Sequence, residues 1–65
     1  MEKDEVEIFL KRNVVAELRG ENRTLVFFGI IKSCGATGAV IDNGLSVALM
    51  RYEDIIQIRE KNIGE

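Results

Sequence analysis

The chain of 65 residues has no histidine, no proline and no tryptophan, and Cys34 is its single cysteine. A metal site is not expected, because the side chains that most often bind transition metals are nearly missing. A disulfide within the chain is excluded because it needs two cysteines. A domain this small buries little apolar surface and usually relies on disulfides, a metal or a partner subunit for stability. We therefore expect oligomerisation to supply the remaining stability.

The same shortages argue against catalysis. Without histidine, Cys34 has no nearby base in the sequence, and the carboxylates gather mainly toward the two ends of the chain. We expect no enzyme, no catalytic residues and no cofactor. Cys34 is interpreted as a small, partly buried apolar side chain.

Long apolar runs are also missing. The apolar stretch 24–31 is far too short to cross a bilayer. The first residues are mostly acidic and do not resemble a secretion signal. A soluble, cytoplasmic protein without a membrane partner is expected, in which a lone cysteine stays reduced.

Charge is low overall but unevenly distributed. The formal net charge of −2 argues against bulk electrostatic binding to nucleic acid. Residues 1–10 are acidic, whereas residues 11–32 are basic and carry Lys11, Arg12, Arg19, Arg23 and Lys32. The basic segment is either a solvated face or a contact for phosphates.

Apolar residues, at 46% of the chain, set the expected secondary structure. A short helix is predicted at about residues 4–12, with Asp4 as N-cap and Glu7 completing a capping box. Alternation of Val6, Ile8 and Leu10 also fits a strand. Turn residues such as Gly20 and Asn22 separate five predicted strands, at residues 14–18, 24–33, 39–41, 45–50 and 55–58.

The strand pattern predicts one mainly β domain over residues 1–65. Five short strands favour a small SH3-like barrel of bent sheet over about residues 14–58, with a polar tail at 59–65. Gly29 predicts a sharp bend in the second strand. Phe27 and Phe28 must face opposite sides of that strand, and the sequence singles out neither as an RNA platform.

The predicted order of a short helix followed by five strands resembles the Sm-like family of LSm and Hfq-like proteins. Two short motifs add to this resemblance. The first, GIIKSCGATGAVI at residues 29–41, keeps the family's spacing of a glycine, a hydrophobe and a following strand. The second, MRYEDIIQI at residues 50–58, resembles the family pattern Ile-Arg-Gly-(Asp/Glu)-Asn-Ile-x-x-Ile. The resemblance covers about residues 14–58.

The resemblance implies a homo-oligomeric ring, a hexamer or heptamer, that binds single-stranded RNA as a chaperone or scaffold. The family's fourth strand pairs with the fifth strand of the next subunit, which would cover the uncharged segment 45–50. Carried over residue by residue, the implied RNA-binding positions are Gly35, Thr37, Gly38, Arg51 and Tyr52.

Several of these positions depart from the family pattern. Gly35 stands at the family's aspartate, and Thr37 replaces the aromatic or histidine that stacks on a base. Arg51 alone matches directly, while Tyr52 is either a substitute stacking face or a residue at a subunit contact. The loop between residues 35 and 38 is either a plain turn or a contact for a phosphate or base. The alternative function is an oligomeric structural or protein-interaction module that has lost nucleotide binding.

Overall fold

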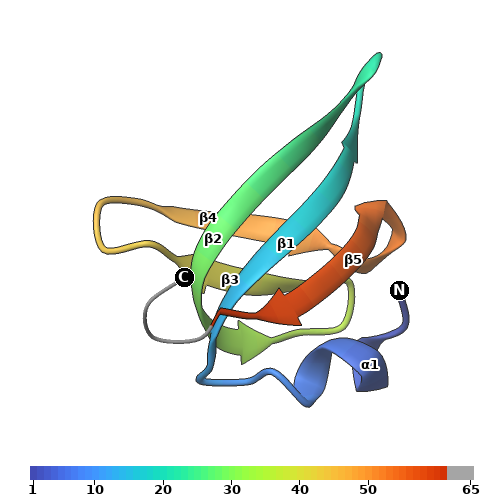
Figure 1. The fold of residues 1–65 in the computed structure, drawn as a ribbon. Helices are drawn as coiled ribbons and strands as arrows, with labels where there is room; N and C mark the ends of the chain where they lie inside the picture. Colours follow the sequence, from blue (N-terminus) through green and yellow to red (C-terminus); the bar gives the residue numbers. More distant parts are fainter. Residues whose placement is uncertain (62–65) are drawn as a thin grey trace.

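The computed structural model describes residues 1–61 and confirms a mainly β chain with a short N-terminal helix (Figure 1). Its elements are α1 (Lys3–Glu7), β1 (Asn13–Gly20), β2 (Arg23–Cys34), β3 (Gly38–Asp42), β4 (Val47–Arg51), the 3-10 turn η1 (Tyr52–Asp54) and β5 (Ile55–Glu60). No helix within residues 1–61 has the length and apolar character needed to cross a membrane.

The strands form one antiparallel sheet in the order β4-β3-β2-β1-β5. Strands β1 to β4 pair with their neighbours along the chain, and β5 returns to pair with β1 (Figure 1). In the described residues β4 and β5 are therefore the two edges of the sheet. The predicted barrel is not closed in this chain, because its first and last sheet positions do not pair with each other.

Strand β2 curves strongly along its length, in keeping with the bend predicted at Gly29 (Figure 1). Gly29 has a φ of +146°, a conformation that residues with a side chain rarely adopt. The register with β3 shifts between Ile31 and Ser33, which marks an irregularity that increases the local twist. Residues 23–30 of β2 pair with β1, and residues 30–34 pair with β3.

The core lies on the inner side of this curved sheet. Alternate residues of β1 are buried, and Ile31 and Met50 are fully buried on β2 and β4. Helix α1 adds Val6, which is also fully buried. Phe27 is half-buried against this core whereas Phe28 is 55% exposed, so the two phenylalanines do face opposite sides.

The helix is shorter than predicted and begins earlier. Its N-cap is Glu2, which forms a capping box with Glu5, where Asp4 and Glu7 had been expected. It ends before Leu10 because Leu10 forms a parallel bridge with Ile31, a partner in β2. This tertiary pairing competes successfully with continuation of the helix.

Most strand ends differ from the prediction by one or two residues, as at the start of β4 and the end of β5. The side chain of Asn43 accepts hydrogen bonds from the backbone N–H groups of Leu45 and Ser46, which holds both residues in the loop before β4. Strand β5 continues through Arg59 and Glu60, which had been assigned to the polar tail. Lys61 of that predicted tail follows β5 and donates its backbone N–H to the Asn13 carbonyl at 2.8 Å, whereas residues 62–65 lie outside the described residues.

Candidate functional site

The five positions named as RNA-binding lie together where the β2–β3 loop meets the end of β4. Gly38 is the ladder partner of Arg51. The backbone N–H of Tyr52 donates to the carbonyl of Thr37 at 3.0 Å. The Tyr52 hydroxyl donates to the carbonyl of Gly35 at 2.7 Å. We call this surface, made by residues 35–38 and 51–53, the loop face.

Glycines allow the two segments of the loop face to approach closely. A Cβ at Gly38 would lie 2.4 Å from the Met50 carbonyl oxygen, so only glycine fits this contact between β3 and β4. The Gly35 N–H donates to the Gly38 carbonyl at 2.9 Å and closes the loop. The Cys-Gly-Ala-Thr-Gly segment is thus a tight turn whose tip, at Ala36 and Thr37, is exposed.

Tyr52 supports the loop face from within the protein. Only 8% of the residue is exposed, and it belongs to the buried core. Burial raises the pKa of its phenol, and the neighbouring Cys34 and Glu7 raise it further. Because the ring packs into its own chain and its hydroxyl holds Gly35, its faces are not presented to a base.

Arg51 is the cation of the loop face. Its guanidinium forms a short salt bridge with Glu53, and both side chains are mostly exposed. An exposed ion pair of this kind contributes little to stability, so a phosphate can compete for the guanidinium. Glu53 is nevertheless a negative charge that any anionic ligand must approach.

The loop face borders a shallow, open hollow. Residues 1–3 line this hollow together with the loop face, and neither they nor Ala36 and Glu53 had been predicted as site residues. Of these, only Glu53 could have been predicted from the sequence, because an acidic side chain two positions after Arg51 can reach its guanidinium. The hollow offers the Thr37 hydroxyl and the Arg51 guanidinium as hydrogen-bonding groups. These groups suit a phosphate or the polar edge of a base.

The described residues show no arrangement for metal chemistry. Within residues 1–61, no group of three or more histidine, cysteine, aspartate or glutamate side chains is placed to hold a metal ion. Cys34 is half-buried and lies beside Tyr52. The polar groups of the loop face can form hydrogen bonds and ion pairs with a ligand.

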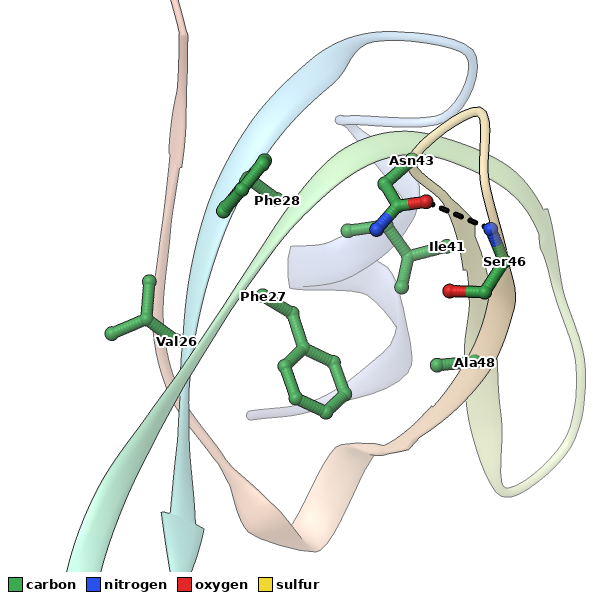
Figure 2. Close-up of a pocket in the computed structure, with 7 residues that line it drawn as sticks. All are labelled: Val26, Phe27, Phe28, Ile41, Asn43, Ser46 and Ala48. Atoms are coloured by element: carbon green, nitrogen blue, oxygen red, sulfur yellow. Dashed lines mark hydrogen bonds between the residues drawn. The ribbon is translucent and has the colours of Figure 1, made fainter.

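The edges of the sheet carry exposed apolar side chains. Val47 and Leu49 are exposed on β4, and Ile56 is exposed on β5. On the inner side of β4, Ala48 lines an apolar pocket with Phe27 and Ile41 (Figure 2). Asn43 and Ser46 form its polar rim, joined by a 2.9 Å hydrogen bond from the Ser46 N–H to the Asn43 side chain. Edge strands with this composition favour pairing with another strand.

No protein-family profile matches this chain, and neither a curated protein sequence nor a solved structure matches it.

Proposed function

We propose that this chain is an Sm-like subunit that assembles head to tail into a ring and binds single-stranded RNA, as a chaperone or scaffold, at the loop face. The observation that carries the proposal is the convergence of exposed Gly35, Thr37 and Arg51 at one end of the sheet, where buried Gly38 pairs with Arg51. These residues come from two motifs that are apart in the sequence, and they meet where the resemblance implies a nucleotide site.

The strand order supports the assembly. Strands β4 and β5 are the two edges of the sheet, so β4 of one copy can pair with β5 of the next. Such a contact joins two different surfaces and closes into a ring when it is repeated with a suitable rotation, as in a hexamer or heptamer. The pocket beside Ala48 gives space for an apolar side chain of the incoming strand, such as Ile56 of the second copy.

Assembly would also strengthen weak binding at each loop face. A single face offers one guanidinium, one hydroxyl and the exposed turn at residues 36–37. Several copies in a ring bring several such faces to one RNA strand, and linked weak contacts give a much higher overall affinity.

Two observations favour a second candidate function. Arg51 is already paired with Glu53, and Tyr52 is buried, so the loop face has no exposed aromatic ring. A ring of the same subunits without nucleotide binding would act as a structural or protein-interaction module. The two candidates share the assembly and differ only at the loop face.

Light scattering tests the assembly. We expect a mass several times the 7.3 kDa of one chain at micromolar concentration. Ile56→Glu should dissociate the assembly, because it places a charge at the paired edge. Ile8→Glu is the matched control, since Ile8 is an equally apolar, exposed residue outside the sheet edges. A folded wild-type monomer would exclude the ring.

RNA binding is tested with U-rich and A-rich oligonucleotides at two salt concentrations. Arg51→Ala should weaken binding by about 1–3 kcal/mol, the scale of a lost charged contact. Glu53→Gln should strengthen it, because it frees Arg51 and removes a negative charge. Arg12→Gln is the control, since Arg12 is also exposed and paired with a carboxylate, that of Glu60. Unchanged affinity in both loop-face variants, or no binding at all, would favour the structural module.

A further inference from the structure

The loop between β3 and β4 contains an asparagine followed by a glycine, Asn43 and Gly44, and this pair occurs nowhere else in the chain. Both residues are exposed. An asparagine side chain can react with its own backbone, because the nitrogen of the next residue lies close enough to attack the side-chain carbonyl carbon and close a cyclic imide. Glycine favours this reaction, since it places no side chain beside the attacking nitrogen.

The attacking nitrogen is already in contact with a carboxylate. The Gly44 N–H donates to Oδ1 of Asp42 at 2.8 Å. A carboxylate at this distance can take up the proton that the nitrogen loses as it attacks, which is general base catalysis. A Cβ built on Gly44 would meet no atom within 4 Å. The loop therefore provides both a base and space around Gly44 for the ring to close.

The carbonyl under attack is also prepared for the reaction. The Asn43 side-chain oxygen accepts hydrogen bonds from the backbone N–H groups of Leu45 at 2.8 Å and Ser46 at 2.9 Å. Figure 2 shows this oxygen turned toward Ser46 and the side-chain nitrogen turned away from it. Negative charge develops on the oxygen during the attack, and backbone N–H groups at this distance stabilise such a charge, as in an oxyanion hole.

We propose that Asn43 is a site of spontaneous deamidation that the folded β3–β4 loop promotes. The Gly44 nitrogen forms a bond to Cγ of Asn43, and its proton passes to Asp42. Asp42 then gives this proton to the side-chain nitrogen as the Cγ–Nδ2 bond breaks, and ammonia leaves. Water opens the cyclic imide at either carbonyl of the ring, which gives aspartate or isoaspartate. No atom is oxidised or reduced, and water is the co-reactant.

The other asparagines within residues 1–61 differ from Asn43 in their neighbours. Asn13 begins β1 and is followed by the β-branched Val14. Asn22 lies in the exposed β1–β2 turn and is followed by Arg23. A side chain on the following residue crowds the attacking nitrogen. Asn13 and Asn22 are therefore internal controls for the reaction at Asn43.

The two products change the loop in different ways. Aspartate at position 43 adds a charge beside Asp42 but still accepts the N–H groups of Leu45 and Ser46. Isoaspartate also inserts a methylene group into the backbone, which displaces the 3.2 Å hydrogen bond from the Asn43 N–H to the Ser46 carbonyl. Isoaspartate therefore loosens the start of β4. The reacting groups belong to one loop of one chain, so the inference does not depend on the proposed function.

Peptide mass spectrometry after incubation of the full chain at neutral pH tests the site. We expect the peptide with Asn43 to gain the mass of an amide converted to a carboxylate, as both aspartate and isoaspartate. Peptides with Asn13 and Asn22 should stay unchanged over the same period. Isoaspartate identifies the cyclic route, because direct hydrolysis of the side chain gives aspartate alone. Aspartate alone, or equal rates at all these asparagines, would overturn the inference.

Asp42→Ser tests the base. A serine hydroxyl can still accept the Gly44 N–H but is a much poorer proton acceptor, so deamidation at Asn43 should slow about tenfold. Glu21→Gln is the matched control, because it removes an exposed carboxylate in the β1–β2 turn and should leave the rate unchanged. A wild-type rate in Asp42→Ser, or an equal loss in Glu21→Gln, would overturn the role of Asp42.

The wild-type chain unfolded in urea shows whether the fold promotes the reaction. Unfolding releases the fixed contacts of the reacting groups with Asp42, Leu45 and Ser46, so Asn43 should deamidate more slowly in urea than in the folded chain. A faster reaction in urea would show that the folded loop protects Asn43, and would overturn the inference. This comparison needs no variant, so it stands even where Asp42→Ser proves unfolded by circular dichroism.

Discussion

Replacing Gly29 by alanine is expected to unfold most of the protein. Gly29 has a φ of +146°, and a Cβ placed there would lie 2.4 Å from the carbonyl oxygen of Asp42. Asp42 cannot easily move away, because it pairs with Ile30 on one side and with Val47 on the other. Both the backbone conformation and the contact therefore oppose a side chain at this position.

The cost is comparable to the whole stability of a chain of this size. A sparsely populated backbone conformation costs about 1–3 kcal/mol. Forcing extra atoms into a packed region costs about 1–3 kcal/mol more. The sum of about 2–6 kcal/mol rivals the 3–5 kcal/mol that the core of so small a domain supplies, roughly speaking.

Three other glycines separate the two contributions. Gly38→Ala meets the Met50 carbonyl at 2.4 Å without a positive φ, so it tests the contact alone. Gly44→Ala has a φ of +93° with nothing within 4 Å of the new Cβ, so it tests the backbone conformation alone. At Gly35 the nearest atom is 3.5 Å away and φ is not positive. Gly35→Ala should therefore be neutral or stabilise by up to about 1 kcal/mol.

Urea denaturation followed by circular dichroism measures these differences. All variants are compared at one protein concentration, because assembly adds to apparent stability. We expect the urea midpoint to fall most for Gly29→Ala and not at all for Gly35→Ala. A Gly29→Ala midpoint equal to that of Gly44→Ala would show that the contact with Asp42 relaxes without cost, and would refute the reasoning.

Three further predictions use the same urea assay. Tyr52→Phe removes the hydrogen bond to Gly35 and should cost about 0.5–1.5 kcal/mol. Burial raises the pKa of Tyr52, so the neutral phenol stabilises the folded state. This contribution to the free energy of unfolding should be complete below about pH 10 and should be lost as the pH rises through the raised pKa of the folded protein. Phenolate absorbance of this single tyrosine follows its ionisation in the folded protein. Ionisation at an ordinary pKa while the protein is still folded would contradict the prediction. Ile31→Ala, at a fully buried position, should cost about 2–5 kcal/mol, and a smaller loss would mean that the core collapses around it. Arg12→Gln breaks the exposed 3.3 Å salt bridge to Glu60 and should cost less than about 1 kcal/mol, so a larger shift would contradict its assignment as a weak surface pair.

Features with a local backbone cause were predictable from the sequence. The hairpin around Gly20 and Asn22 is present, and Asn22 has a positive φ, a conformation that asparagine tolerates in turns. The bend at Gly29 follows from the same kind of constraint. The five strands were also predicted, because β-prone apolar runs alternate with turn residues throughout the chain. The length of α1 was not predictable, since it depends on the pairing of Leu10 with Ile31.

The candidate site was predictable only where motif spacing carried the information. The meeting of Gly38 with Arg51 follows from two motifs that occupy neighbouring strands. The burial of Tyr52 depends on the space beneath the β2–β3 loop, which no local pattern shows. Which residues lie side by side across β2, β1 and β5 depends on the register of β1 with both of its neighbours, which no local pattern shows.

The return of β5 to the side of β1 has a consequence for how the chain folds. Strands β1 to β4 pair in sequence order and can form by successive short hairpins, whereas the pairing of Val14 with Glu60 joins residues separated by most of the described chain. Contacts of such long sequence separation form slowly, because a large loop must close before they stabilise anything. Until β5 arrives, β1 presents a free row of backbone donors and acceptors to other chains. Refolding yield should therefore fall as protein concentration rises, and variants that weaken β5 should lose the most material to aggregation.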